Sequence, residues 1–579
     1  MTSAEFRAHV RNKLKHSGNR VLLRVLLSAN SDDIVEFTGP ELLRQADEIT
    51  SRFADDHSGV VLLLLPHSVE LFLLHLGLVL RGKVPAILAW PTKRVDAGKY
   101  QRNLFHQLRS LPAAQLITVP GIADNLAPLL PFPVSKCVVT AGSAREDVFG
   151  PRVSLESVPR VAPGRKAPLP IDSLFLQFSG GTTGAQKCVV INARILTEQL
   201  TRLGKALSFS KEDGVVSWLP LYHDMGLIAC FWLPLWQQAA SLQFAASDWL
   251  LKPDLLLECL ERHRATFSWL PNFAFSYMAM QRSRMRGVRS LSHVRSLINC
   301  SEPVRLDSIS RFVNAFAEWG ISAASVQASY AMAENVFAVT QTPVGSDWKI
   351  HSRSSFASSA VERAQATFTV NGDYVSSGSP LEGMQVRIRD QANRPCPEGT
   401  PGNIELSTRS LFRGYWGEDG YVASSFTEDG WYATGDYGFL SSGELFVVGR
   451  MKDIIIVGGQ NVFPEDVEGV VNSLPGVYPG RAVAFGLTDE QLGTETIAVV
   501  AELKGEYSRR AAEELERRIL QSVLAAIGIA PRHVRVHPER WIVKSTAGKI
   551  SRIETKAKFM QESSRCAGIQ DTEYEVAAK

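Results

Sequence analysis

Ser179-Gly180-Gly181-Thr182-Thr183-Gly184-Ala185-Gln186-Lys187 lies between two apolar runs, residues 174–178 and 189–191. This pattern predicts a strand, a glycine-rich loop and a second strand. Glycines let a backbone come close to a ligand and turn its N–H groups inward, while Thr182, Thr183 and Lys187 add hydroxyl donors and a positive charge. The stretch matches neither the Walker pattern nor G-x-G-x-x-G. It indicates a loop for a polyphosphate, and the alternative is a surface turn that binds nothing.

The composition is typical of a globular protein with more than one domain. The 579 residues exceed what a single core normally holds, and 45% of them are hydrophobic and 21% charged. The net charge of +3 gives no basic surface for nucleic acid, so we expect no nucleic-acid partner.

The cysteines and the hydropathy of the sequence indicate the cellular compartment in which the protein is expected. The seven cysteines form no C-x-x-C pair, which argues against a zinc site and for a reducing compartment. Residues 1–20 are polar and lack the apolar segment of a signal peptide. The most apolar region, residues 60–90, is interrupted by Glu70, Arg81 and Lys83, which favours a core strand and helix over a membrane span. We therefore expect a cytoplasmic protein without a membrane span.

Strands and helices alternate in the first part of the chain. Residues 60–65 are predicted to form a buried strand, 68–80 a helix and 84–89 another strand. Thr38 is predicted to cap a helix that reaches Phe53. Such β-α-β alternation predicts a parallel sheet covered by helices, and therefore an α/β fold.

Polar residues follow the ends of four later predicted strands, residues 215–219, 265–270, 294–299 and 326–330. The residues that follow them include His223 and Asp224, Asn272, Ser301 and Glu302, and Glu334. Because the carboxyl ends of parallel strands meet at one edge of a sheet, we expect these residues to form one active-site edge. Taken alone, the His223-Asp224 pair is explained as well by a structural role as by a functional one.

The sequence pattern predicts an N-terminal domain, residues 1–451, and a smaller C-terminal domain, residues 452–562. Within the first, residues of about 380–451 show short alternating strands and turns, which predicts a β-rich subdomain. Residues of about 341–378 are rich in Ser and Ala and predict an insertion or loop rather than core. Residues 563–579 are expected to be a disordered tail.

The C-terminal domain contains a predicted amphipathic helix over residues 508–527. The apolar side of this helix is expected to consist of Leu515, Ile519, Leu520, Val523, Leu524 and Ile527. Its arginines lie mostly off that side, which favours a solvated face, with contact to a carrier protein as the alternative.

In their order along the chain, these motifs resemble those of the adenylate-forming (AMP-binding) superfamily of acyl-activating enzymes. The resemblance covers residues of about 35–560. It implies an α/β fold with a large N-terminal domain of mixed and parallel sheets, a β-rich subdomain and a small, mobile α+β C-terminal cap. It also implies an acid–AMP ligase that uses ATP and Mg²⁺ and acts on a small-molecule carboxylic acid.

The resemblance assigns roles to residues of this sequence. The implied catalytic residues are Lys187, Glu334 and Lys549, of which Glu334 would also bind the metal. The implied nucleotide contacts are Ser179, Thr182, Thr183, Gly184, Ser301, Glu302, Tyr330, Ala331, Met332, Asp436 and Arg450. Lys452 matches the hinge between the two domains.

Within the superfamily, three stretches are similar to those of fatty acyl-AMP ligases. They are Leu219-Pro220-Leu221-Tyr222-His223-Asp224-Met225-Gly226-Leu227-Ile228, Pro271-Asn272-Phe273-Ala274-Phe275 and Asn299-Cys300-Ser301-Glu302-Pro303-Val304. The implied substrate pocket is lined by His223, Asp224, Met225, Gly226, Phe231, Asn272 and Phe273. This likeness implies transfer of a fatty or related acyl group to the phosphopantetheine arm of an acyl carrier protein, and an insertion near residues 341–378 that disfavours CoA.

The sequence departs from the superfamily pattern at named positions. Gln186-Lys187-Cys188 stands where Pro-Lys-Gly is usual, and Ala331 stands where the adenine motif usually has its second glycine. Lys187 and Glu334 remain, so activity is expected. Three alternatives stay open: an acyl-CoA synthetase, a free-standing amino-acid or aryl-acid adenylation enzyme, and an inactive nucleotide-binding module.

Overall fold

The computed structural model describes residues 1–29, 33–53, 59–91, 97–139, 167–179, 186–351, 368–369, 373–422, 425–458, 460–489, 494–544 and 549–562. The chain divides into two compact units. The first unit comprises Met1–Ser179, Ala185–His351 and Tyr374–Val448, and the main segment of the second begins at Gly449. The expected disordered tail, residues 563–579, lies outside the described residues.

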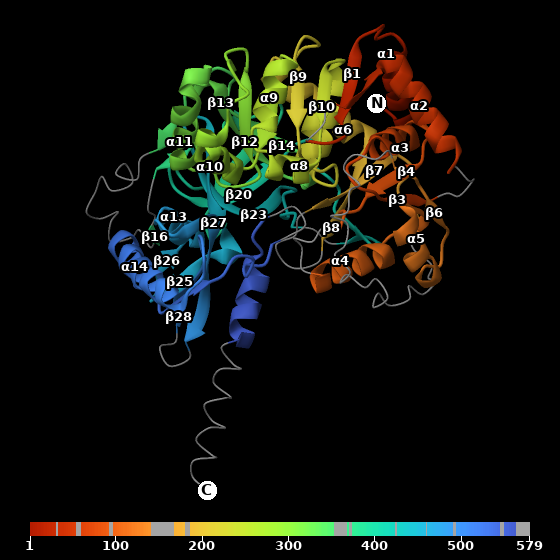
Figure 1. Cartoon of the computed structure of the whole chain (residues 1–579). Coiled ribbons are helices and arrows are strands. Elements are labelled where there is room, and N and C mark those ends of the chain that lie inside the picture. The colour runs from red at the N-terminus through yellow and green to blue at the C-terminus, as the bar shows by residue number, and fades with distance from the viewer. Residues whose placement is uncertain are drawn as a thin grey trace. The chain divides into compact units, whose positions relative to one another are not determined.

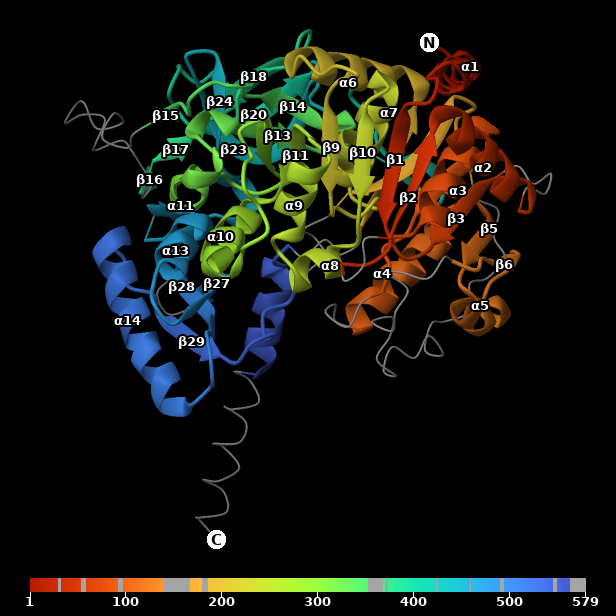
Figure 2. The same ribbon diagram turned by 45° about the horizontal axis from the view of Figure 1, so that its top comes forward.

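A nine-stranded sheet forms part of the first unit. In order across the sheet, its strands are β18 (Ser379–Pro380), β14 (Ala338–Gln341), β13 (Val326–Ala331), β12 (Ser296–Cys300), β11 (Phe267–Leu270), β9 (Gly214–Ser217), β10 (Ala240–Gln243), β1 (Val21–Leu26) and β2 (Ile34–Thr38). The strands from β13 to β1 in this order run parallel, and the strands outside them pair antiparallel. Figure 2 shows β9, β10, β1 and β2 side by side at one end of the sheet. The predicted parallel arrangement is confirmed, and the four strands with polar ends are neighbours.

An eight-stranded sheet forms a second layer of strands in the first unit. Its order is β22 (Gly420–Val422), β21 (Tyr415–Gly417), β8 (Lys187–Asn192), β7 (Ser173–Ser179), β4 (Val84–Ile87), β3 (Val60–Leu64), β5 (Ala113–Thr118) and β6 (Val134–Lys136). The predicted strands on either side of the glycine-rich stretch are β7 and β8, which pair antiparallel with Ser179 opposite Lys187. The two described ends of that stretch are therefore adjacent, while residues 180–185 lie outside the described residues.

Helices pack on these sheets, as Figure 1 shows for the first unit. They are α1 (Ser3–Lys15), α2 (Gly39–Ser51), α3 (Val69–Leu80), α4 (Ala97–Ser110), α5 (Pro120–Leu126), α6 (Ala193–Ala206), α7 (Leu233–Gln237), α8 (Ala246–Leu251), α9 (Leu255–Arg262), α10 (Asn272–Gln281) and α11 (Leu306–Phe316). The predicted cap on α2 is present as a capping box, because Thr38 Oγ1 accepts from the Glu41 N–H and the Glu41 carboxylate accepts from the Thr38 N–H.

The apolar region of residues 60–90 forms core elements. Every residue of α3 is buried, and its first turn is capped by Ser68. A helix that is apolar on all sides belongs in the centre of a large core. None of the helices in the described part of the chain combines the length and the apolar character that crossing a membrane requires.

Two small sheets complete the first unit. The β-rich region holds a four-stranded sheet in the order β19 (Gln385–Arg389), β20 (Gly402–Ser407), β23 (Tyr432–Ser441) and β24 (Glu444–Arg450), and β15 (Ile350–His351) pairs with β17 (Tyr374–Val375). The expected insertion at residues 341–378 has core residues at both ends. Gln341 is buried in β14, and Ser376 and Ser377 are buried beyond β17. Residues 352–367 and 370–372 of this segment lie outside the described residues.

The second unit contains two three-stranded sheets. One has the order β16 (Phe368–Thr369), β26 (Gln460–Val462) and β25 (Ile455–Val457), and the other has the order β27 (Val477–Asp489), β28 (Thr494–Leu503) and β29 (His533–His537). Figure 1 shows α13 (Pro464–Asn472) and α14 (Arg509–Ile527) beside these strands. Val467 and Val471 of α13 share a core with Ile519 of α14 and Val499 of β28.

The apolar side of α14 is narrower than the sequence predicts. Leu515, Ile519, Val523 and Ile527 are buried, whereas Leu520 and Leu524 are 40% and 45% exposed. The expectation that Leu520 and Leu524 face the core was therefore wrong. The helix lies over a small sheet, and only the stripe at i, i+4, i+8 and i+12 reaches it.

A buried guanidinium organises the loops of the second unit. Arg552 lies 2.6 Å from the Asp453 carboxylate, 2.8 Å from that of Glu468 and 3.2 Å from that of Glu465. Its Nε also donates to the Ala484 carbonyl at 2.9 Å. Burial opposes the charge, but the three carboxylates together raise the pKa of Arg552. The cluster thus ties the chain after β24 to α13 and to the segment that contains Lys549.

Removing this cation should selectively destabilise the second unit. In Arg552→Met, three carboxylates stay buried without their counter-charge, which typically costs about 3–5 kcal/mol. Hydrogen exchange followed by mass spectrometry should show that loss of protection in peptides of β27 and α13. The control is Arg509→Met on α14, whose pair with Glu513 is solvent-exposed, and its effect should stay within about 0.5 kcal/mol. Equal protection in the two variants would contradict a structural role for the cluster.

Candidate active site

The ends of the parallel strands bring several of the predicted residues together. Asn272, the first residue of α10, lies beside Asn299 at the end of β12, and the Asn299 side-chain amide donates to Asn272 Oδ1 at 3.0 Å. The same oxygen accepts from the Arg305 N–H at 3.1 Å. Asn272 thus holds the chain that leaves β12, and its role is positional in this structure.

Ser301 and Glu302 continue from β12 into the same region. Ser301 has a φ of 75°, an unusual conformation for a residue other than glycine. Its hydroxyl lies 3.8 Å from Met225 Sδ. The Glu302 carboxylate accepts from the Phe273 N–H at 3.0 Å, at the start of α10. The predicted edge residues from three strands are therefore neighbours.

The stretch after β9 turns sharply at His223 and Asp224. The Asp224 carboxylate lies 2.7 Å from His223 Nδ1 and accepts from the Met225 N–H at 2.8 Å. A π-helix, Met225–Trp232, follows instead of a regular helix, and π-helical turns often occur at functional sites. A Cβ on Gly226 would lie 2.4 Å from the Pro220 carbonyl oxygen, so this turn requires glycine.

Two aromatic residues of the predicted pocket have different surroundings. Phe231 is buried among Phe72, His75 and Trp232, within a core cluster of rings. Phe273 is only partly buried and packs at 6.1 Å from the ring of Trp249. Phe273 therefore lies at the edge formed by the strand ends, whereas Phe231 lies in the core of the first unit.

A hydrogen bond between Tyr330 and Asp436 joins the nine-stranded sheet to the four-stranded sheet. Tyr330 lies near the end of β13, and its hydroxyl donates to Asp436 Oδ2 at 2.6 Å. Asp436 is buried in β23, and its N–H donates to Thr434 Oγ1 at 3.0 Å. Gly435 between them has a φ of 77°, which favours glycine. The motif Thr434-Gly435-Asp436 thus aims its carboxylate at the tyrosine.

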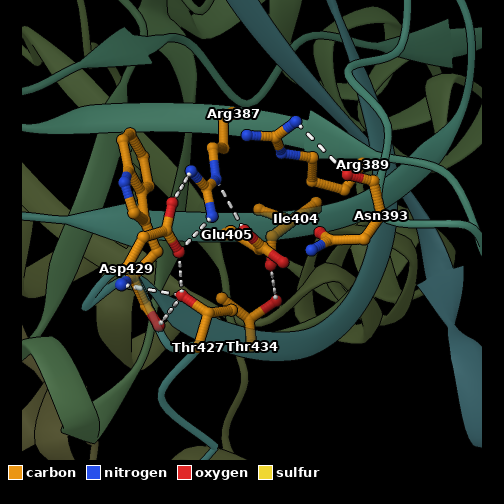
Figure 3. Close-up of polar contacts among 9 residues, drawn as sticks. Arg387, Arg389, Asn393, Ile404, Glu405, Thr427, Asp429 and Thr434 are labelled. Carbon is orange, nitrogen blue, oxygen red and sulfur yellow. Dashed lines mark hydrogen bonds and ion pairs between the residues drawn. The ribbon is translucent and has the colours of Figure 1, made fainter.

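Figure 3 shows the polar contacts that support the start of β23. Arg387 binds both oxygens of Asp429, at 2.5 and 2.9 Å, and donates to Glu405 at 2.6 Å. Thr434 Oγ1 donates to the Ile404 carbonyl at 2.9 Å. The two-pronged contact with Arg387 holds the pKa of the Asp429 carboxyl well below its usual range. These contacts fasten the turn before β23 to β19 and β20.

Glu334 lies in a short 3₁₀ turn, Ala333–Asn335, directly after β13. Its carbonyl accepts from the Phe412 N–H at 2.9 Å. Val336 after the turn has a φ of 67°, which a β-branched side chain rarely adopts. Such a strained backbone persists only where the surrounding contacts over-determine it, and it is commonest at functional sites.

Tyr415 is a site residue that the sequence analysis did not identify. Its hydroxyl donates to Glu334 Oε1 at 2.5 Å and lies 3.1 Å from the Tyr432 hydroxyl. The ammonium of Lys187 lies over the Tyr415 ring, 4.3 Å from its centroid. In the sequence, Tyr415 stands out only as part of Gly414-Tyr415-Trp416, an aromatic pair after a glycine in the β-rich region. This pattern does not indicate that Lys187, more than 200 residues earlier, is a partner.

The remaining predicted residues have the following places. Ala331 ends β13, and the N–H of Met332 donates to the Phe337 carbonyl at 2.9 Å. Thr182, Thr183 and Gly184 lie outside the described residues. Arg450, Lys452 and Lys549 belong to the second unit, Lys452 in a 3₁₀ turn and Lys549 next to the bridge that Ile550 forms with Lys544.

The residues of the first unit suit a nucleotide with its metal. The Asp436 carboxylate can only accept hydrogen bonds, and the hydroxyl groups of a ribose can donate to it. The Lys187 ammonium offers a positive charge to a phosphate. Among the described residues, no group of three or more acidic, histidine or cysteine side chains could enclose a metal ion. Mg²⁺ typically takes one or two carboxylates and completes its coordination with substrate phosphates and water, so Glu334 alone fits that donor set.

Comparison with known proteins finds a family of AMP-binding enzymes and relatives that are named as AMP ligases or adenylyltransferases. The chain matches the AMP-binding enzyme family over residues 12–416. A probable long-chain-fatty-acid–AMP ligase of Mycobacterium tuberculosis, FadD30, is 31% identical over 416 residues, which cover 66% of this chain and 69% of that protein. A 4-hydroxyphenylalkanoate adenylyltransferase of Mycobacterium bovis is 28% identical over 533 residues, which cover 86% of this chain and 82% of that protein.

A solved structure from work on fatty acyl-adenylate ligases of E. coli and L. pneumophila shares the fold. It aligns with a TM-score of 0.77 at 21% identity and covers 98% of each chain. The expected α/β fold of adenylating enzymes is thereby confirmed. The family match spans more than half of the sequence, from the first helix to β21. The chain therefore belongs to the AMP-binding enzyme family, whose members activate acids by forming adenylates.

Proposed function

We propose that this enzyme converts a fatty or related carboxylic acid to its acyl adenylate and then passes the acyl group to the phosphopantetheine thiol of an acyl carrier protein. One observation carries the proposal. The segment of β13 and the turn after it supplies Tyr330 and Glu334, while β23 supplies Asp436 and Tyr432. Tyr330 donates directly to Asp436, and Glu334 is joined to Tyr432 through the Tyr415 hydroxyl of β21. The groups proposed for ribose and metal thus lie on these two segments, and Lys187 of β8, the group proposed for phosphate, lies over the Tyr415 ring.

The first step is a displacement at phosphorus. A carboxylate oxygen of the acid attacks the α-phosphorus of ATP, the bond from that phosphorus to the bridging oxygen breaks, and pyrophosphate leaves with the electron pair. No proton has to move, so the protein contributes chiefly by positioning the reactants and by neutralising charge.

Each proposed role follows from the chemistry of the side chain. Asp436 accepts from the ribose hydroxyls, Tyr330 lies against the adenine with Ala331 and Met332, and Lys187 with Thr182 and Thr183 holds the polyphosphate. Glu334 binds Mg²⁺, which neutralises phosphate charge when it is bound. Lys549 binds the reacting carboxylate and the α-phosphate.

The second step transfers the acyl group. The thiol sulfur attacks the acyl carbon, the bond to the AMP oxygen breaks, AMP leaves with that electron pair, and the thiol proton is released to solvent. We assign to Lys452 the hinge that lets the second unit serve first adenylation and then transfer. Asp453, its neighbour, is fixed by Arg552, so rotation is concentrated at or before Lys452.

The acid and the acceptor are tested in one pair of assays. Exchange of labelled pyrophosphate into ATP should depend on a fatty acid or an arylalkanoic acid, the second class being that named for the Mycobacterium bovis relative. The activated acyl group should then appear on a purified holo-acyl carrier protein in preference to CoA. Exchange with amino acids alone would favour an amino-acid adenylating enzyme, transfer to CoA alone an acyl-CoA synthetase, and no exchange an inactive module.

Lys549→Ala should lose most adenylate formation while ATP still binds. Loss of a charge-assisted contact made in the transition state typically lowers the rate about 10²–10³-fold. Acid-dependent pyrophosphate release measures the rate, and equilibrium binding of an ATP analogue measures the affinity. Lys504→Ala, at an exposed turn of the same unit, is the matched control. Unchanged pyrophosphate release in Lys549→Ala would exclude the assigned role.

Lys452→Pro should separate the two steps. Proline fixes φ near −65°, so it restricts rotation at the hinge without removing a group that touches ATP. We expect nearly normal pyrophosphate exchange and a loss of acyl transfer of about tenfold or more, equivalent to at least 1.4 kcal/mol on the second barrier. Equal losses in both assays would count against a hinge at this residue.

A further inference from the structure

Tyr415 joins two residues to which the proposed function gives separate roles. Its hydroxyl donates to the Glu334 carboxylate at 2.5 Å, and its ring lies under the Lys187 ammonium at 4.3 Å. One side chain therefore contacts both the proposed metal ligand and the proposed phosphate-binding cation.

The pairing of strands explains why the tyrosine is there. β21 runs antiparallel to β8, with Tyr415 opposite Val189 and Trp416 opposite Cys188. Lys187 and Val189 are two residues apart and point to the same face of β8, so Lys187 is a diagonal neighbour of Tyr415 across the two strands. The sheet register thus places the lysine over the ring.

Contacts from other elements fix the tyrosine in its place. The Phe412 ring packs edge-on against the Tyr415 ring at 4.9 Å, and the Phe412 N–H donates to the Glu334 carbonyl. The segment of residues 412–415 therefore holds Glu334 twice, by its backbone and by its carboxylate. Two attachments determine the orientation of a side chain far better than one.

The direction of the hydrogen bonds follows from proton counting. The Tyr415 hydroxyl lies within hydrogen-bond distance of two groups, the Glu334 carboxylate and the Tyr432 hydroxyl. Its single proton goes to the Glu334 carboxylate, which can only accept. The Tyr432 hydroxyl, 3.1 Å away, must therefore donate to the Tyr415 oxygen. The result is a directed chain from Tyr432 through Tyr415 to Glu334, in which each bond strengthens the next.

We propose that Tyr415 is a positioning residue, which orients the Glu334 carboxylate for the metal and keeps it beside Lys187. This inference rests on the proposed function. In the proposed site Glu334 is the one protein carboxylate that binds the metal. The metal affinity therefore depends more strongly on the orientation of this carboxylate than it would in a site with several protein ligands. Loss of the hydrogen-bond partner of a metal ligand typically weakens metal binding about 10–100-fold.

Tyr415→Phe tests the hydroxyl without disturbing the ring. We expect the affinity for Mn²⁺, used as a paramagnetic probe in place of Mg²⁺, to fall about 10–100-fold in the presence of a non-hydrolysable ATP analogue. Electron paramagnetic resonance of free Mn²⁺ measures this directly, without turnover. Binding of the analogue without metal should stay unchanged, because Phe keeps the ring beneath Lys187. Unchanged Mn²⁺ affinity would overturn the proposal.

Three further variants make the result interpretable. Tyr421→Phe removes an exposed hydroxyl from the neighbouring strand β22 and should leave both affinities at wild-type values. Tyr432→Phe removes the first bond of the chain and should give a smaller loss of Mn²⁺ affinity than Tyr415→Phe. Glu334→Gln separates the two hypotheses: if it leaves Mn²⁺ affinity unchanged, the assigned metal role fails, whereas a loss in Glu334→Gln with none in Tyr415→Phe refutes only the role of the tyrosine.

Discussion

The carboxyl end of β13 is the point at which three sheets of the first unit are joined. Tyr330 donates from the nine-stranded sheet to Asp436 in the four-stranded sheet, and Glu334, just beyond β13, accepts from Tyr415 in the eight-stranded sheet. The candidate site depends on this junction, because each sheet alone offers only part of what a nucleotide needs. The parallel strands bring polar chain ends to one edge, and the two other sheets supply Asp436 and Lys187, to which the proposed function gives the ribose and the phosphate.

The junction has an energetic cost that the surrounding contacts offset. Val336, two residues after Glu334, has a φ of 67°, and backbone strain of this kind costs about 1–3 kcal/mol. Asp436 and Glu334 bring carboxylates into a largely buried region, where each needs a hydrogen-bond partner. Glu334 accepts from the Phe412 N–H and from the Tyr415 hydroxyl, and Asp436 accepts from the Tyr330 hydroxyl. Arg387 in turn holds the turn before β23 through Asp429. A site that must hold ATP in one geometry benefits from such redundancy, because small displacements lower catalytic rates strongly.

Local signals in the sequence predicted much of the fold. The cap at Thr38, the buried run of β3 and the polar residues after parallel strands all depend on neighbours within a few residues. The π-helix after Asp224 has no sequence signal of its own, because an apolar run of this kind fits an α-helix equally well. Tyr415 escaped notice because its partners Glu334, Tyr432 and Lys187 come from three other segments of the chain. Lys187 is brought to it by a β21–β8 pairing that spans more than 200 residues, and hydrophobic periodicity carries no information on such register. Leu520 and Leu524 of α14 are exposed for a similar reason. The sequence of a helix does not tell how wide the sheet surface is that covers its apolar side.

In the proposed function, a nucleotide binds where β13 and β23 meet. A crystal structure of the enzyme with a non-hydrolysable acyl-adenylate analogue tests it most directly. We expect to find the ribose hydroxyls within hydrogen-bond distance of Asp436, the adenine against Tyr330, and the phosphate mimic on the side of Lys187. An analogue bound elsewhere in the first unit, with Asp436 and Tyr330 still bonded only to each other and to protein groups, would contradict it.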